Sequence, residues 1–128
     1  MERQRVLIAD DDLTILQLLR KTLAPHYDVL EANNGADALE LALSEKPDCV
    51  VLDVMMPELN GWEVCKTIRS HEAYNSTGIL MVTAIGETLN DMTSELYGAD
   101  DHVNKPFELE EVLTKVEEII SKHQADSF

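Results

Sequence analysis

The chain has 128 residues, 45% of them hydrophobic, so we expect one domain with an ordinary core and no second folded domain. Its 25 acidic residues against 10 basic ones give a formal net charge of −15 at pH 7. A surface of this sign repels phosphates, so we expect no direct contact with nucleic acid or anionic membranes. A secretory signal is absent, and no apolar run approaches the ~20 residues of a transmembrane helix, so we expect a cytoplasmic location.

Apolar runs alternate with segments of helical periodicity along the chain, which is typical of repeated βα units. The first strand is predicted at 6–9, and the apolar stripe of the helix after it is Leu16, Leu19 and Leu23. The next strand, at 27–31, mixes polar and apolar residues. The stripe of its following helix is Ala36, Leu39 and Leu43.

The second half of the chain continues the same pattern. A continuously apolar strand is predicted at 49–52, and Asn60 with Glu63 resembles a capping box before a helix whose stripe is Val64, Cys65 and Ile68. A further apolar strand at 79–82 precedes a helix with Leu89, Met92 and Leu96. A polar strand at 102–104 precedes the last helix, whose stripe is Leu109, Val112, Leu113, Val116, Ile119 and Ile120. Both cysteines lie at apolar positions and are expected to be free and inert.

These elements predict a doubly wound α/β fold, (βα)5, around a five-stranded parallel sheet. The continuously apolar strands belong in its centre and the two mixed strands at its edges, which gives the order 2-1-3-4-5. We expect residues 1–123 to form this domain and 124–128 to be a C-terminal tail without an output domain. Ligands of such sheets bind at the carboxyl ends of the strands, near the first and third.

Polar residues follow each central strand at that edge. Asp10 and Asp11 follow the first strand, Asp53 the third, Thr83 the fourth and Lys105 the fifth. Converging carboxylates repel one another unless a cation neutralises them, and oxygen ligands favour a hard ion such as Mg²⁺. A lysine and a hydroxyl complete a site for phosphoryl transfer, with Asp53 as the nucleophile.

Each of these residues also has a plainer interpretation. The aspartates 10–12 could cap the first helix, Thr83 could be a turn residue, and Lys105 a surface charge. Met55 and Met56 are interpreted as packing residues, although the Met55 carbonyl is near enough to Asp53 in sequence to reach a metal. The joint placement of the polar residues favours the phosphoryl-transfer interpretation.

Five segments, 6–12, 51–61, 82–84, 98–101 and 104–107, resemble in order and spacing the motifs of response-regulator receiver domains of two-component signalling. The resemblance covers Arg5 to Lys122 and implies a flavodoxin-like (CheY-like) fold. It also implies phosphorylation of Asp53, a role for Lys105 and Thr83 in binding the phosphoryl group, and a cis peptide bond before Pro106. The implied Mg²⁺ ligands are Asp11, Asp53 and the Met55 carbonyl, with Asp10 contributing through water.

The resemblance further implies partners. The phosphoryl donor would be a phosphohistidine on a sensor histidine kinase or phosphotransfer protein, and the domain would catalyse only this transfer and its own later dephosphorylation. Phosphorylation would move Thr83 and an aromatic residue of the fifth strand, changing the face of the fourth helix, fifth strand and fifth helix. A downstream protein or output domain would read that face, and a homodimer could form through it.

Two positions depart from the family pattern. His102 stands where the family usually has tyrosine or phenylalanine, so we expect a weaker or pH-sensitive coupling between the phosphate and the output face. Ile85 offers no polar group to position an attacking water, so we expect slow to moderate loss of the phosphoryl group.

Three rival interpretations belong to other classes. A haloacid-dehalogenase-like phosphatase would use Asp10 as nucleophile, because Asp10, Asp12 and Thr14 satisfy its Asp-x-Asp-x-Thr pattern, but it leaves Asp53 unexplained. A flavodoxin-like electron carrier should have a hydroxyl-rich first loop, which the acidic loop here excludes. An interaction domain with an inactive pocket is disfavoured because every expected pocket residue is present.

Overall fold

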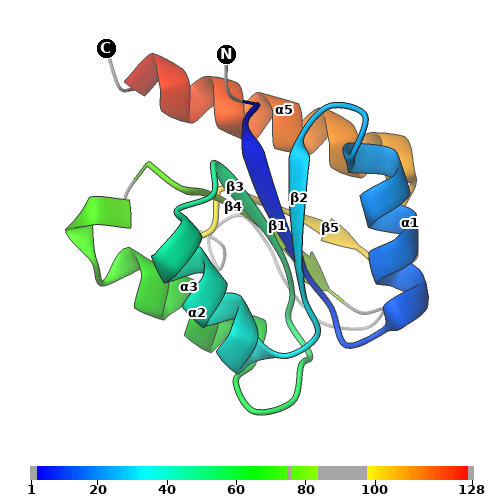
Figure 1. Ribbon diagram of the computed structural model, residues 1–128, viewed down its shortest axis with the longest axis horizontal. Helices are drawn as coiled ribbons and strands as arrows, with labels where there is room; N and C mark the ends of the chain where they lie inside the picture. The colour runs from blue at the N-terminus through cyan, green and yellow to red at the C-terminus, as the bar shows by residue number, and fades with distance from the viewer. Residues whose placement is uncertain (1–2, 75, 84–97, 127–128) are drawn as a thin grey trace.

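The computed structural model describes residues 3–74, 76–83 and 98–126 (Figure 1). Its sheet is formed by β1 (Arg5–Ala9), β2 (Asp28–Ala32), β3 (Cys49–Asp53), β4 (Gly78–Thr83) and β5 (Asp101–Asn104). All the pairings are parallel, and the order is β2-β1-β3-β4-β5. The predicted strands, their order and the edge positions of β2 and β5 are therefore confirmed.

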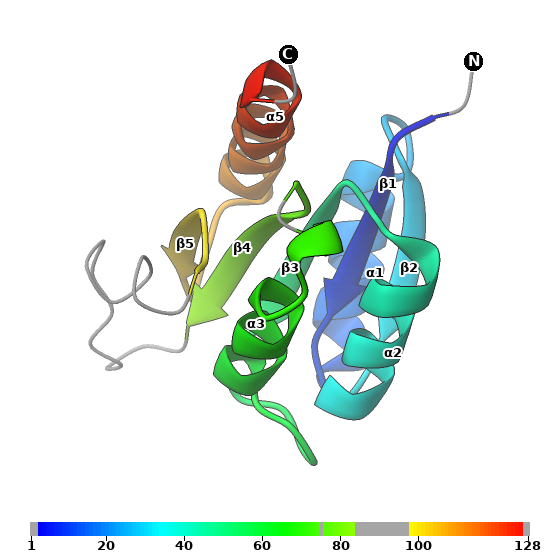
Figure 2. The same cartoon turned by 90° about the vertical axis from the view of Figure 1, so that its left-hand side faces the viewer.

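The described helices are α1 (Leu13–Leu23), α2 (Gly35–Glu45), α3 (Gly61–Arg69) and α5 (Leu109–Asp126), with a short 3-10 helix, η1 (Glu72–Tyr74). α1 and α5 cover one face of the sheet, and α2 and α3 cover the other (Figure 2). α5 continues to Asp126, past the boundary predicted at 123. The predicted helix with Leu89, Met92 and Leu96, and also Ile85, lie outside the described residues.

The core has two halves because alternate residues of each strand point to opposite faces. Every residue of β3 and β4 is buried, as a central parallel strand requires. Cys49 and Cys65 are buried thiols that form no disulfide, one in each half of the core. Burial raises the pKa of both, that of Cys65 to about 12. Both are therefore packing residues, as predicted.

Among the described residues, no helix has both the length and the apolar character needed to cross a bilayer.

Polar N-cap residues fix the first turns of the helices that begin near the carboxyl ends of the strands. Asp12 is the N-cap of α1 and accepts a hydrogen bond from the Thr14 N–H at 2.9 Å. Asn60 and Glu63 form the predicted capping box of α3, with the Glu63 N–H 2.9 Å from the Asn60 side-chain oxygen. These caps define where the loops that bear the polar residues end.

The apolar stripe of α2 differs from the prediction. Ala36 is exposed and Leu39 is only partly buried, whereas Gly35, Ala38 and Ala42 are buried against the sheet. Small residues on this side let the helix axis approach the sheet closely, and the leucines then pack at its flanks. Periodicity identified the helix but gave the wrong face, because it follows the largest apolar side chains.

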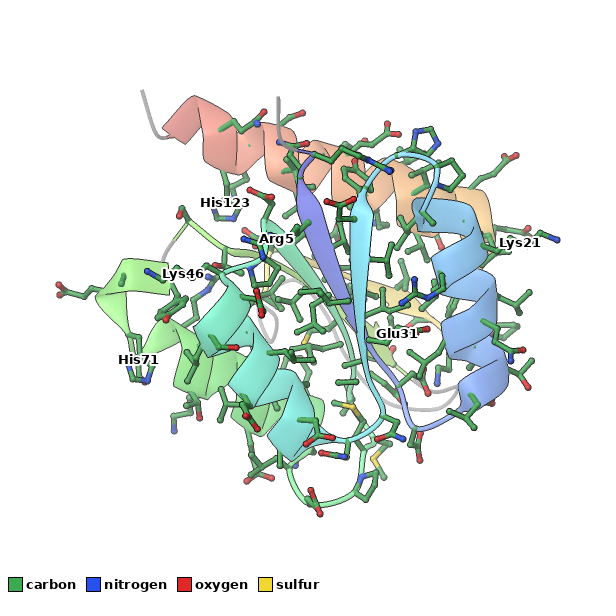
Figure 3. The ribbon with its side chains drawn as sticks, in the orientation of Figure 1. Arg5, Lys21, Glu31, Lys46, His71 and His123 are labelled. Atoms are coloured by element: carbon green, nitrogen blue, oxygen red, sulfur yellow. The ribbon has the colours of Figure 1, made fainter. Side chains whose placement is uncertain are left out.

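A partly buried network of ion pairs and hydrogen bonds lies around Asp100, just before β5. One Asp100 oxygen accepts from Arg69 at 3.1 Å and from the Ile79 N–H at 2.8 Å. The other lies 2.9 Å from the His123 ring, which points from α5 back toward the sheet (Figure 3), and 3.3 Å from Lys122. His123 is thus a partner in this network. The network joins α3, β4, β5 and α5.

We expect Asp100→Ala to lower the free energy of unfolding by about 3 kcal/mol, because the partly buried Arg69 charge would lose its partner. The matched control is Asp28→Ala, which breaks an exposed ion pair with Arg3 of 3.7 Å and should cost less than about 1 kcal/mol. Urea denaturation of both variants measures the difference. Equal losses would show that the Asp100 network adds nothing beyond surface charge.

Candidate functional site

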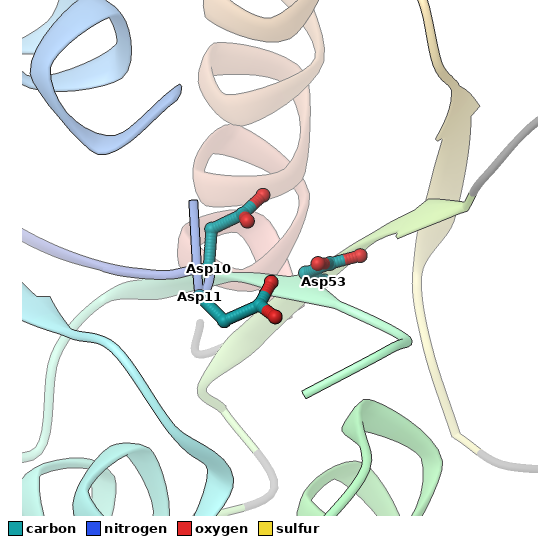
Figure 4. Close-up of side chains that lie close together, drawn as sticks. All are labelled: Asp10, Asp11 and Asp53. Atoms are coloured by element: carbon teal, nitrogen blue, oxygen red, sulfur yellow. The ribbon is translucent and has the colours of Figure 1, made fainter. Parts of the chain in front are cut away.

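Three carboxylates converge where β1 and β3 end. Asp10 and Asp11 directly follow β1, and Asp53 is the last residue of the adjacent strand β3. Each can offer one oxygen such that all three oxygens lie within 4.8 Å of one another (Figure 4). Asp10 and Asp53 are buried, with 1% and 3% of their surface exposed, whereas Asp11 is exposed. The predicted cluster is therefore present, with one side open to solvent.

Lys105 reaches the same point from the end of β5. Its ammonium lies 3.1 Å from Asp10 and 3.3 Å from Asp53. Its backbone N–H donates to the Thr83 carbonyl at 2.7 Å, and the peptide bond to Pro106 is cis, as the resemblance implied. The lysine therefore bridges two buried carboxylates and is not a free surface charge.

Burial and like charge set the proton affinities of the site. Burial, with the Asp10 charge second, raises the pKa of Asp53 from 3.8 to about 6, and Lys105 opposes this rise only in part. Burial lowers the pKa of Lys105, but its contacts with Asp10 and Asp53 outweigh this and hold it above its usual value. Lys105 therefore stays charged, while the pocket keeps excess negative charge.

Asp10 and Asp12 have different roles in the structure: one caps a helix and the other belongs to the carboxylate cluster. Asp12 caps α1, as the plainer interpretation had it. Asp10 accepts from the Asp12 N–H at 2.9 Å through one oxygen and contacts Lys105 through the other. The Asp10 side chain is thus held pointing into the cluster.

Thr83, the last residue of β4, is fully buried and turned toward β5. Its hydroxyl lies 2.6 Å from the Asn104 side-chain oxygen and 3.3 Å from the Val103 carbonyl. The structure therefore places Thr83 at the expected strand end, with its hydroxyl engaged by the neighbouring strand. Asn104 is not among the site residues predicted from the sequence, because its contact depends on the β4–β5 register, Thr83 opposite Asn104.

The loop after β3 brings the backbone of Met55 near the cluster. The Met55 N–H lies 3.4 Å from an Asp53 carboxylate oxygen. The Met55 side chain is 60% exposed, so its interpretation as a packing residue is wrong, whereas Met56 is buried as predicted. Glu58 has φ 72°, a left-handed conformation that turns the loop back toward α3.

Comparison with known proteins identifies this arrangement. The sequence model of the response regulator receiver domain matches residues 6–117. This chain belongs to the response regulator receiver domain family. The receiver is 40% identical over 122 residues to the alkaline phosphatase synthesis transcriptional regulatory protein PhoP of Bacillus subtilis, and 39% identical over 123 residues to the response regulator MprA of Mycobacterium leprae.

These alignments cover 94% and 95% of the chain but 50% and 53% of the two relatives, so the receiver spans about half their length. Among solved structures, it resembles the Francisella response regulator 1452 receiver domain, with a TM-score of 0.84, 30% identity and coverage of 94% and 98% of the two chains. It also resembles the chemotaxis response regulator CheY4 of Vibrio cholerae, with a TM-score of 0.82, 31% identity and coverage of 91% and 98%. The CheY-like fold is therefore confirmed, and the haloacid-dehalogenase interpretation finds no support.

The pocket of the receiver favours a hard divalent cation. Its three carboxylates supply only oxygen ligands, and one of them, Asp11, opens to solvent. Such a set suits an ion that keeps several waters and takes one or two carboxylates, as Mg²⁺ does. The excess negative charge left beside Lys105 is the physical reason why a cation would bind here.

We expect Asp53→Asn to stabilise the metal-free receiver above pH 6. The pKa of Asp53 lies above its ordinary value, so the folded state binds a proton that the unfolded chain releases. The stability from this group is therefore full below about pH 4 and is lost as the pH rises through 6. Asparagine does not ionise, so its advantage should grow from about pH 4 to 6 and level off above that. At ~1.4 kcal/mol per pKa unit we expect a plateau of about 1–3 kcal/mol, several degrees in Tm.

Thermal unfolding in a chelating buffer at several pH values measures this advantage. The exposed variant Asp28→Asn is the control for a general change in surface charge. A Tm difference between Asp53→Asn and the wild type that does not vary with pH would contradict the prediction.

Proposed function

We propose that this receiver accepts a phosphoryl group on Asp53 from a phosphohistidine donor, with Mg²⁺ bound beside it. The observation that carries the proposal is the position of Lys105, whose ammonium contacts the carboxylates of Asp10 and Asp53 at once. An ammonium in that position can contact the acceptor oxygen of Asp53 and an oxygen of the incoming phosphoryl group at the same time. Phosphoryl transfer needs mainly such positioning and neutralisation of charge.

In the proposed step, an Asp53 carboxylate oxygen attacks phosphorus. The P–O bond of an aspartyl phosphate forms while the P–N bond of the donor histidine breaks, and the electron pair returns to the imidazole nitrogen. Lys105 balances charge on the transferred group. The buried surroundings of Asp53 keep bulk water away from the acceptor oxygen.

The cation would be held by Asp11, Asp53 and the Met55 carbonyl, with Asp10 contributing through water. When bound, Mg²⁺ would neutralise the carboxylates and the charge of the phosphoryl oxygens. The proximity of the three carboxylates supports this assignment, as does the Met55 backbone beside Asp53. The receiver would catalyse its own phosphorylation and dephosphorylation and no other reaction.

A protein donor must bring its histidine to the rim where Asp53 lies. Beside Lys105, a groove of about 770 Å³ is lined by Ile15, Leu18, Phe107 and Leu109, and Leu18 is 45% exposed. On α1, Leu13 is 63% exposed. These apolar side chains next to the acceptor suit contact with a sensor histidine kinase or phosphotransfer protein.

We expect incubation with acetyl phosphate and Mg²⁺ to add one phosphoryl group to the wild type, measured as intact-protein mass. Asp53→Asn and a sample with chelated metal should show no adduct, because the first lacks the acceptor oxygen and the second the neutralising cation. Asp28→Asn, a change of the same kind on an exposed aspartate, should be modified normally. An adduct that persists in Asp53→Asn would overturn the assignment and bring Asp10 forward as nucleophile.

The proposed switch begins at Thr83. To contact a phosphoryl oxygen, its hydroxyl must leave the Asn104 side chain and the Val103 carbonyl, so phosphorylation would change hydrogen bonding on β5. His102 lies on the same strand, partly buried and opposite Met81. β5 contacts α5 through the Asp101–Lys115 ion pair of 2.9 Å.

A downstream protein or output domain, or a second receiver in a homodimer, would bind the face formed by β5, α5 and the fourth helix. That fourth helix, predicted from the sequence, lies outside the described residues.

We expect His102→Tyr to strengthen this coupling and to remove its pH dependence. Histidine changes charge between about pH 5 and 8, and tyrosine offers a larger apolar body that stays neutral. NMR shifts of α5 amides on phosphorylation should differ between pH 6 and pH 8 in the wild type and agree in the variant. Equal shifts in both proteins at both pH values would show that His102 does not affect the coupling.

A further inference from the structure

Close backbone packing holds the loop of residues 54–60, which carries the Met55 carbonyl. At its end, the Gly61 N–H donates to the Val54 carbonyl at 2.8 Å. A Cβ at Gly61 would lie 2.4 Å from the Asp53 carbonyl oxygen. The base of the loop is therefore fixed against β3 itself.

The tip of the loop is held from a different element. Gly35, the first residue of α2, donates its N–H to the Pro57 carbonyl at 3.3 Å. A Cβ at Gly35 would lie 1.8 Å from the Leu59 carbonyl oxygen and 2.6 Å from its carbon. Both are backbone atoms, so a side chain at position 35 requires the loop backbone to move outward by about 1 Å or more.

The need for glycine at position 35 comes from space and not from backbone conformation. Gly35 begins a helix, where alanine is favoured over glycine by roughly 0.5–1 kcal/mol. Glu58, between the two loop residues that Gly35 contacts, has the left-handed φ of 72° that a non-glycine residue adopts only at a cost. The Leu59 N–H donates to the Pro57 carbonyl at 2.9 Å and closes this bend within the loop. The same Pro57 carbonyl accepts from Gly35, so α2 adds a second contact at the loop tip.

We propose that Gly35 is a positioning residue for the cation, because it fixes the loop that places the Met55 carbonyl relative to Asp53. The inference rests on the proposed function, which assigns that carbonyl to Mg²⁺. Displacing Pro57 and Leu59 would swing the loop about its base, and Met55 lies between base and tip. Residues that orient metal ligands without touching the metal typically change metal affinity about 10–100-fold.

The test compares Gly35→Ala with Gly78→Ala in the full chain. Gly78 begins β4, and a Cβ there would lie 2.3 Å from the Ile119 side chain, so the control adds the same atom and also causes a clash, but with a side chain and remote from the loop. NMR titration with MgCl₂ gives the Kd, and the ¹³C shift of the Met55 carbonyl reports its coordination. Gly35→Ala should raise the Kd about 10–100-fold and reduce the Mg²⁺-induced Met55 shift, whereas Gly78→Ala should change neither.

A second measurement needs no variant. If Gly35 and the cation act on the same loop, Mg²⁺ must in turn stabilise the contact between the loop and α2. Hydrogen exchange of the Gly35 N–H in the wild type should therefore slow when Mg²⁺ is added. The Gly78 N–H, which donates to the Asp48 carbonyl at 2.9 Å, should be unaffected.

The outcomes separate the two proposals. A wild type that does not bind Mg²⁺ overturns the cation assignment and this inference with it. If the wild type binds Mg²⁺ and Asp53→Asn does not, while Gly35→Ala keeps the wild-type Kd and Met55 shift, only the role of Gly35 is overturned. An unchanged exchange rate at Gly35 on Mg²⁺ saturation would also overturn that role, even if Gly35→Ala failed to fold.

Discussion

Two buried carboxylates share one ammonium in this receiver, and the rest of the site depends on that imbalance of charge. Lys105 contacts both Asp10 and Asp53, while Asp11 adds a third negative charge at the open side. Burying such charge is unfavourable unless it is paired. The parallel pairing of β1 with β3 nevertheless forces the carboxylates together, since both strands end at the same edge. The apolar core therefore stabilises a pocket that is left short of positive charge, and such a pocket favours the binding of a cation.

Those parts of the fold that depend on continuous patterns could be predicted from the sequence. Unbroken apolar runs separate β1, β3 and β4 from the mixed edge strands, and this contrast determines the strand order. The residues that follow these strands then identify the acidic cluster and Lys105, because parallel strands share one carboxyl edge. Spacing and topology together were enough for this part of the site.

Contacts that depend on a close fit between distant elements could not be predicted in this way. The buried face of α2 is formed by its small residues, and periodicity of large apolar side chains does not detect close approach. The Thr83–Asn104 contact requires the register of β4 with β5. The Asp100 network brings together residues from α3, β4 and α5, and its members are ordinary surface residue types in the sequence.

β5 is held at both ends, which limits how it could move in the proposed switch. At its end, Lys105 donates to the Thr83 carbonyl and Thr83 contacts Asn104. Before its start, the Asp100 N–H donates to the Ile79 carbonyl at 2.9 Å, and the Asp100 carboxylate forms ion pairs with Arg69 of α3 and Lys122 of α5. Sliding β5 along β4 would break both sets of contacts together, at about 1–3 kcal/mol for each buried charged hydrogen bond. Rotation of the Thr83 side chain and rearrangement of side chains on β5 would break only the contacts at the end of β5, beside Asp53. If phosphorylation acts as proposed, these contacts favour local side-chain exchange on a strand that stays in register, with the Asp101–Lys115 ion pair as the link to α5.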